Sequence, residues 1–387
     1  MQKGRAHQEV LTSSGGDRSS VAWFLLGLIG CGDGADAVSS AGAIVSVDLP
    51  APTVEAVTAS ASVTVKPPPA RPALPQPDLY PTKLDEQREA MFGRMQAMLG
   101  TSDAELVAVK QIFAKSPVLS QGNPELTEYA MTRAECIKVR ADANVVDEDD
   151  PVCGAPLMVP LWDPKAGETK ANAKVCIDRY EFPNIPCEYP VTWVQGVEAA
   201  KLCKAIGKRI CDAHEWEGGC AGALHPPDAE YKWGKPRKEM KFSHNADREI
   251  VWAYGAQKDH PKCGTASHKN KSCKESGWKK CGSNSYPAGS FPACKSPFGV
   301  YDQHGNVAEH MNLPLNKKQL ASAGGAGETE MKGSWFIFQK FEAHEDDCRW
   351  RAPDWHAAKL MSPDSHLNYH LGFRCCKDVG EAASPTP

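Results

Sequence analysis

The fifteen cysteines of this 387-residue chain limit its possible folds more than any other feature. They are spread from Cys31 to Cys376 and form no C-x-x-C pair, which argues against a zinc ribbon. Cysteines in such numbers are typical of disulfide frameworks, which form and persist in oxidising compartments. We therefore expect an exported chain whose main domain is cross-linked by disulfides.

Export has independent support at the amino terminus. An apolar run over residues 21–29 follows several basic residues, and it is too short to span a bilayer but fits the hydrophobic segment of a signal peptide. The run ends in L-I-G-C at residues 28–31, which resembles the bacterial lipobox. This resemblance implies cleavage before Cys31 and attachment of lipid to that residue. Residues 1–30 are thus predicted to be a lipoprotein signal peptide, with a buried core segment as the alternative.

A lipid on Cys31 predicts a location in the bacterial cell envelope, in the periplasm or at the cell surface, with a membrane as the first partner. Residues 31–81 are rich in Ala, Val, Ser, Thr and Pro and predict an unstructured tether, since they contain few large apolar side chains. The net charge of -4 gives no long-range attraction to nucleic acid, so no nucleic-acid partner is expected.

A small helical region is predicted over residues 82–150. Apolar residues recur there at helical spacing, and two capping boxes mark the starts of helices. These boxes pair Ser102 with Glu105 and Thr132 with Glu135. The acidic run that follows predicts a solvated loop, so the helices end before the main domain begins.

The main domain is expected over residues 151–377, and a disordered tail over residues 378–387. Asp212 and Glu215 have the capping-box spacing again and predict a further helix in this domain. His214 lies in the first turn of that helix, and we expect it to be exposed. Glu215 could act as an acid or a base, but its capping role already explains it.

Residues 296–312, S-P-F-G-V-Y-D-Q-H-G-N-V-A-E-H-M-N, combine turns with closely spaced oxygen donors. These donors are the carboxylates of Asp302 and Glu309 and the backbone carbonyls of Gly305 and Val307. A hard cation such as Ca²⁺ prefers a mixed shell of this kind. The alternative is a polar turn in which the Asn306 side chain bonds its own backbone.

Four motifs occur in order along the second half of the chain. They are Y-P-V-T-W-V-Q-G-V-E-A-A-K-L-C-K-A-I-G-K-R-I-C-D-A-H-E-W-E-G-G-C-A-G at residues 189–222, G-V-Y-D-Q-H-G-N-V-A-E at 299–309, G-S-W at 333–335 and L-G-F-R-C at 371–375. Together they resemble the formylglycine-generating enzyme family, also called sulfatase-modifying factors. The resemblance implies an α+β fold: an irregular C-type-lectin-like domain with short helices around small sheets.

The resemblance also implies metal ligands and disulfides. Its calcium ligands fall on Asp302, Gly305, Val307 and Glu309, with Asn245 and Ala246 as possible ligands of a second ion. Its two disulfides fall on Cys203 with Cys375 and on Cys220 with Cys348. Calcium is therefore the cofactor expected from the resemblance.

The copper site of the family is not matched. In catalytic members two cysteines bind copper at positions that are here Ile337 and Glu342, and neither side chain replaces a thiolate. Three further departures from the family's motifs are Lys332, Ala308 and His310. Cys348 comes too late in the chain to restore the cysteine pair without a gap. We therefore expect no copper at these positions and no oxidation of a substrate cysteine to formylglycine.

Three interpretations of the function come from different classes of protein. The leading one is a non-catalytic binding module for a protein or peptide ligand, because the loss of two soft ligands is a specific observation. The second is a metal-dependent oxidase, with copper held by Cys348 and a neighbour, or iron held by His304, His310 and His344. The third is a structural envelope protein.

Overall fold

The computed structural model of the chain describes residues 80–273, 277–352 and 357–380. The predicted signal peptide, Cys31, the tether up to residue 79 and the tail from residue 381 lie outside these ranges. Among the helices described, none is both long enough and apolar enough to cross a membrane.

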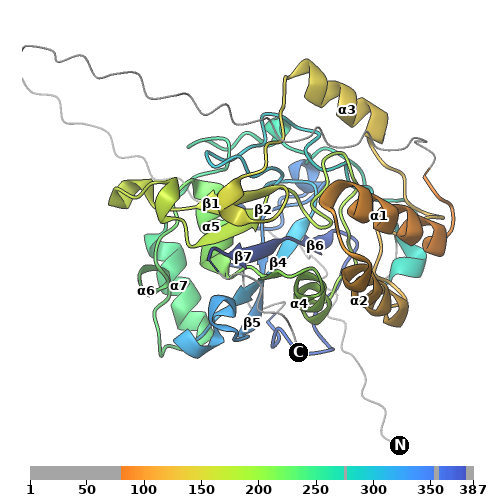
Figure 1. The fold of residues 1–387 in the computed structure, drawn as a ribbon. Coiled ribbons are helices and arrows are strands. Elements are labelled where there is room, and N and C mark those ends of the chain that lie inside the picture. Colours follow the sequence, from red (N-terminus) through yellow and green to blue (C-terminus); the bar gives the residue numbers. More distant parts are fainter. Residues whose placement is uncertain (1–79, 274–276, 353–356, 381–387) are drawn as a thin grey trace, which may run out of the picture. The chain divides into compact units, whose positions relative to one another are not determined.

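Two small sheets form the centre of the domain (Figure 1). One has the strand order β1-β2-β7-β3 and is antiparallel throughout, and the other has the order β5-β4-β6, with β4 antiparallel to β5 and parallel to β6. The strands are β1 (Met158–Leu161), β2 (Val175–Asp178), β3 (Arg209–Ile210), β4 (Ala308–Leu313), β5 (Glu328–Lys332), β6 (Leu371–Phe373) and β7 (Cys375–Asp378). Only Arg374 separates β6 from β7, so this residue lies where the chain passes from one sheet to the other.

Short α-helices surround the sheets. They are α1 (Leu84–Leu99), α2 (Asp103–Lys115), α3 (Arg133–Asp142), α4 (Gly196–Ala205), α5 (Ala213–Ala221), α6 (Pro227–Glu230) and α7 (Arg237–Asp247). In the view of Figure 1, α1, α2 and α4 lie on one side of the sheets and α6 and α7 on the other. The predicted capping boxes begin α2, α3 and α5.

The helical region shares a hydrophobic core with the main domain. Met95 of α1 and Phe113 of α2 belong to the same buried cluster as Leu202 of α4 and Phe373 of β6. A disulfide from α3 to residue 187 adds a covalent link. The region that precedes the main domain is therefore packed against it.

All fourteen cysteines within the described ranges are paired. The seven disulfides join Cys136 to Cys187, Cys153 to Cys176, Cys203 to Cys375, Cys211 to Cys376, Cys220 to Cys348, Cys263 to Cys294 and Cys273 to Cys281. The pairs from Cys203 and from Cys220 are those that the family resemblance implies. This degree of cross-linking fits an oxidising compartment.

Helix α5 is buried from Ala213 to Cys220 and contacts strands of both sheets. Glycine makes this close packing possible, since a Cβ at Gly218 would lie 2.8 Å from the Cα of Leu224. The helix also carries charged side chains into the interior, where each needs a partner because burying an unpaired charge is costly. The candidate functional site is therefore built around α5.

Candidate functional site

The first turn of α5 is covered rather than exposed. His214 is only 4% exposed, and its Nδ1 lies 3.1 Å from the hydroxyl of Tyr231. The prediction of an exposed His214 is therefore wrong. The capping box locates the turn correctly, but it carries no information about the segment after α6 that packs over it.

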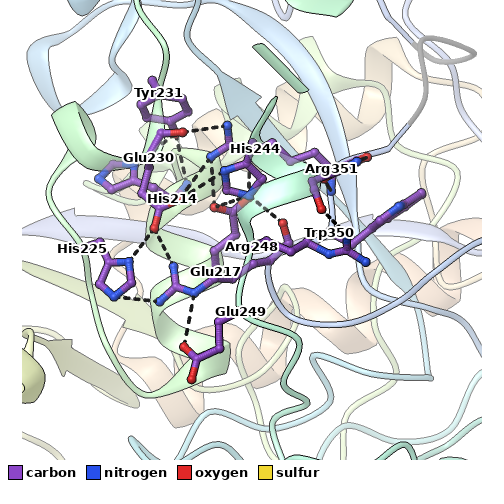
Figure 2. Close-up of polar contacts among 12 residues, drawn as sticks. His214, Glu217, His225, Glu230, Tyr231, His244, Arg248, Glu249, Trp350 and Arg351 are labelled. Atoms are coloured by element: carbon purple, nitrogen blue, oxygen red, sulfur yellow. Dashed lines mark hydrogen bonds and ion pairs between the residues drawn. The ribbon is translucent and has the colours of Figure 1, made fainter. Parts of the chain in front are cut away.

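Glu217 of α5 lies fully buried between two cations. Arg351 donates from Nε to Oε1 at 3.0 Å and from Nη2 to Oε2 at 3.1 Å (Figure 2), and Nζ of Lys332 lies 3.1 Å from Oε1. Burial alone would raise the pKa of Glu217, but the charges of Arg351 and Lys332 outweigh it and hold the pKa far below its usual range. Glu217 is therefore ionised at neutral pH.

Glu230, the last residue of α6, is the second carboxylate of this cluster. Its Oε1 accepts a hydrogen bond from Nη1 of Arg349 and lies 2.7 Å from Nδ1 of His225. Its Oε2 lies 3.3 Å from Nδ1 of His244, which projects from α7. Figure 2 shows the Glu230 carboxylate at the centre of these contacts.

His244 connects α7 to the segment around Arg349. Its Nε2 donates to the Arg349 carbonyl at 2.7 Å. Burial and the charge of Arg351 lower the pKa of His244 to about 4, so the imidazole is neutral at neutral pH. We call this cluster, made of Glu217, Glu230, His244, Lys332, Arg349 and Arg351, the Glu217 network.

The Glu217 network contains a group of potential metal ligands. One ligand atom each from Glu217, Glu230 and His244 lie within 4.8 Å of one another. The network contains three cationic side chains and two carboxylates, so a divalent ion would enter a buried site whose net charge is already positive. The arrangement is therefore an ion-pair network rather than a metal centre.

A cavity of about 240 Å³ adjoins the outer side of the Glu217 network. Its polar lining includes His225, Glu230, His244, Arg248, Glu249 and Arg349. Within this lining, Nε of Arg349 makes no hydrogen bond, and its charged neighbour Glu249 is 4.0 Å away. The volume and the lining suit a small polar group, such as one side chain of a peptide.

The loop expected to hold calcium lies elsewhere, next to Arg374. Both oxygens of Glu309 accept hydrogen bonds from Arg374, each at 2.7 Å, and Nε1 of Trp216 donates to Oε2 at 3.0 Å. As it stands, the Glu309 carboxylate does not fit a calcium ligand, because a guanidinium already supplies the positive charge. Gly305 lies in the same loop, where its N–H donates to the Ser334 hydroxyl, and this bond leaves its carbonyl, the predicted ligand, untested.

Asp302 fits a cation better than Glu309 does. Its Oδ2 accepts a hydrogen bond from the Gly289 N–H, whereas its Oδ1 is buried without a hydrogen-bond partner. Burial raises the pKa of Asp302 to about 6. Burial, together with the charge of Asp302, also raises the pKa of Glu181, and neither oxygen of Glu181 has a hydrogen-bond partner. We call these two carboxyls the Asp302 pair.

The second calcium site implied by the resemblance involves Asn245 and Ala246 of α7. The Asn245 amide bridges the backbone of Arg351, accepting from its N–H and donating to its carbonyl, each at 2.9 Å. Ala246 is exposed on the same helix. Calcium at both places stays a prediction, with Asp302 the best placed of the carboxylates.

The two copper positions differ in burial. Ile337 is buried in an apolar cluster with Trp335, Phe336 and Phe338. Glu342 is at the surface, with Oε2 3.1 Å from Nζ of Lys258. Neither position offers a soft ligand, and every cysteine of the described ranges is held in a disulfide.

The three histidines considered for iron are not brought together as one site. Nε2 of His310 contacts the Val194 carbonyl at 3.0 Å, and the His344 ring stacks on Trp350 with 4.4 Å between centroids. His304 lies instead beside a disulfide, with Nε2 3.3 Å from Sγ of Cys220. Among the described residues, no group of three potential ligands contains two of these histidines.

Sequence reasoning missed the Glu217 network as a whole. Its members come from α5, α6, α7, β5 and the segment around residue 350, and they share no motif or spacing. The one available signal is local, since E-W-E-G-G-C places two glutamates in a helix whose glycines and tryptophan predict burial. That signal indicates buried partners without identifying them.

The comparisons with known proteins agree with the motifs. The family model described as the sulfatase-modifying factor enzyme 1-like domain matches residues 125–379, more than half of the chain. The chain therefore belongs to the sulfatase-modifying factor family, and the predicted family and α+β fold are confirmed. A solved structure titled Major Tropism Determinant I1 Variant is similar at 13% sequence identity and a TM-score of 0.25, over 58% of this chain and 55% of that one. No curated protein matches the chain.

Proposed function

We propose that this protein is an exported, lipid-anchored member of the family that binds a ligand and does not generate formylglycine. One observation carries the proposal: a buried isoleucine and a surface glutamate stand at the copper positions, and the described cysteines are all oxidised. A disulfide sulfur is neither a thiolate ligand nor a nucleophile. Copper chemistry of the family's type therefore lacks its ligands.

The ligand that suits the domain is a protein or peptide. The cavity beside the Glu217 network would accept one polar side chain, with Arg349 and Glu249 offering charges of both signs at its wall. A rigid, cross-linked scaffold lowers the entropy cost of holding such groups in place. A photo-reactive cross-linker placed at the rim of this cavity would capture bound proteins. The captured proteins would then be candidates for direct binding measurements.

The decisive test is turnover. The full-length protein, loaded with copper, should not convert a sulfatase-type cysteine peptide to formylglycine, whereas an active family member assayed in parallel should. Ile337→Cys with Glu342→Cys should not restore activity, because Ile337 lies inside an apolar cluster while Glu342 lies at the surface. Turnover by the unmodified protein above a metal-free control would overturn the proposal and favour the oxidase alternative.

The lipid anchor has its own test. Protein isolated from membranes should begin at Cys31 and carry a diacylglyceryl group, and Cys31→Ser should release it into the soluble fraction. Mass spectrometry is the measurement. An intact Met1 terminus, or an unmodified Cys31 after cleavage elsewhere, would contradict this part of the proposal without affecting the part that concerns copper.

A further inference from the structure

A second cavity shares no residue with the cavity beside the Glu217 network. It measures about 220 Å³ and is formed by the segment after α3, the residue that follows β2 and the loop before β4. Both charged side chains that line it are cations, and no acidic residue of the described ranges contributes to its wall. We call it the Arg179 cavity, and its wall includes Val145, Val146, Arg179, Pro292, Lys295 and Tyr301.

Arg179 has a hydrogen-bond donor that the protein leaves unused. Its Nη2 donates to the Glu148 carbonyl at 2.8 Å, whereas its Nε is buried and has no hydrogen-bond partner in the described part of the chain. Its contact with a carboxylate is long, with Nη1 4.0 Å from Oδ1 of Asp147. Only 15% of the Arg179 side chain is exposed, so solvent compensates for the missing partner only in part.

Asp147 is held by other groups. Its Oδ2 accepts a hydrogen bond from Nη2 of Arg140 at 2.7 Å, and its Oδ1 accepts one from the Tyr180 hydroxyl at 2.5 Å. Lys295 has no ion-pair partner among the described residues, and its Nζ lies 6.0 Å from the centroid of the Tyr301 ring. Three cations therefore share one carboxylate, and the Arg179 cavity has a positive charge that the protein does not neutralise.

The donors at the wall suit a carboxylate better than a phosphate. Phosphates are commonly held by several backbone N–H groups. At this wall four such groups already donate to carbonyls of the chain at 2.8–3.0 Å, namely those of Asn144, Val145, Gly299 and Tyr301. The donors that remain are a guanidinium and an ammonium group, which match the two oxygens of a carboxylate.

The volume restricts the ligand to one group of a larger molecule. Pockets that enclose a whole small molecule measure roughly 300–1,000 Å³. The Arg179 cavity is smaller, and Val145, Val146 and Pro292 place apolar surface beside its two cations. A carboxylate on a short apolar stem fits this wall, and a peptide offers one at its carboxyl terminus and in each aspartate or glutamate side chain.

We propose that the Arg179 cavity binds a carboxylate of a peptide ligand, which accepts a hydrogen bond from Arg179 and is attracted by Lys295. That the ligand is a peptide rests on the proposed function. The carboxylate site itself depends only on the wall of this cavity. It is distinct from the cavity beside the Glu217 network, so the two can hold different groups of one ligand.

The experiment measures binding of three small probes to the full-length protein by ligand-observed NMR. N-acetylvaline presents a terminal carboxylate, the α-amide of N-acetylaspartate presents a side-chain carboxylate, and N-acetylvalinamide presents none. At least one carboxylate should bind with a dissociation constant of roughly 1 mM, as expected for a fragment with few contacts. The neutral amide should bind at least about tenfold more weakly, because it lacks the charge-assisted hydrogen bond. The tighter carboxylate identifies the source, and inorganic phosphate should compete more weakly than either.

Variants locate the binding. Arg179→Gln should weaken carboxylate binding at least about tenfold. Val146→Asp should also weaken it, since it adds a like charge to the wall, whereas Val146→Asn, of similar size and neutral, should not. Val146 is 69% exposed, so these two variants remain informative if Arg179→Gln does not fold. The matched control is Lys138→Gln on α3, an exposed cation outside the cavity, which should bind like the wild type.

Three results would overturn the proposal. The first is equal binding of N-acetylvaline and its amide, or no binding of either carboxylate in the millimolar range. The second is a preference for phosphate over both carboxylates. The third is carboxylate binding that is unchanged in both Arg179→Gln and Val146→Asp. None of these results bears on formylglycine turnover, and turnover would in its turn leave the carboxylate site standing.

Discussion

Two buried groups of carboxyls in one domain differ in whether their oxygens have charged or hydrogen-bonding partners. In the Glu217 network each carboxylate contacts a guanidinium, and Glu217 contacts an ammonium group as well. In the Asp302 pair, three of the four carboxyl oxygens have no hydrogen-bond partner. Both groups are buried, so burial alone does not decide whether a carboxyl is ionised. The partners decide it.

The two groups should therefore respond to pH with opposite signs. The folded pKa of Glu217 lies below its unfolded value, so its contribution to stability is present above pH 4.5 and is lost as the pH falls. The folded pKa of Asp302, about 6, lies above its ordinary value of 3.8. The ionised form of Asp302 therefore destabilises the fold above about pH 6, and this cost disappears as the pH falls toward 4.

The largest effect is expected from breaking the Glu217 network. Glu217→Gln should lower the free energy of unfolding by about 3–5 kcal/mol, because it leaves Arg351 and Lys332 buried without their shared carboxylate. Denaturant unfolding at neutral pH is the measurement. Glu239→Gln on the exposed face of α7 is the control, with an expected change within about 0.5 kcal/mol. A loss below about 1 kcal/mol for Glu217→Gln would show that water reaches the network.

The Asp302 pair should respond in the opposite direction. Asp302→Asn keeps an oxygen for the Gly289 N–H, suits the left-handed backbone at φ 57°, and removes a buried charge. It should stabilise the protein by about 2–3 kcal/mol at pH 7, from a shift of about two pKa units. The gain should vanish near pH 4, where the wild-type carboxyl is protonated in the folded state. Unfolding curves at the two pH values test this.

The matched control for Asp302→Asn is the same substitution at a paired residue. Asp347 is equally buried, but Nη2 of Arg248 lies 2.8 Å from its Oδ2. Asp347→Asn should therefore destabilise the protein at pH 7. If both substitutions destabilise it, or if the gain from Asp302→Asn is equal at pH 4 and pH 7, the proposed difference between the two groups is wrong.

What the sequence could predict depended on how far apart the interacting residues lie. The capping boxes of α2 and α3 are local, and each pairs residues three positions apart, as in Ser102 and Glu105. The motifs were sufficient for the family and the α+β fold. The Glu217 network was beyond reach, because Glu217 and Arg351 are 134 positions apart and no periodicity connects them.

The wrong prediction for His214 and the position of His304 also show that the sequence does not predict contacts between distant segments. Composition and spacing describe what a residue can do, whereas burial depends on segments that are distant in the chain. His304 was grouped with two other histidines because of its chemistry, yet the fold places it against Cys220 and Asp346. Tertiary contacts alone decide which of several possible ligands meet.

The smallest effect concerns calcium, which would give the Asp302 pair the positive charge that the Glu217 network already has. With an affinity near 10⁻⁴ M, calcium at about 1 mM should add roughly 1.4 kcal/mol to the free energy of unfolding. Glu309 is held by Arg374, so the gain should depend on Asp302: it should persist in Asp347→Asn and disappear in Asp302→Asn. Unfolding with calcium and with chelator is the measurement. Identical curves for the wild type would mean that the loop binds no calcium. The negative charge of the Asp302 pair would then be neutralised by protonation alone.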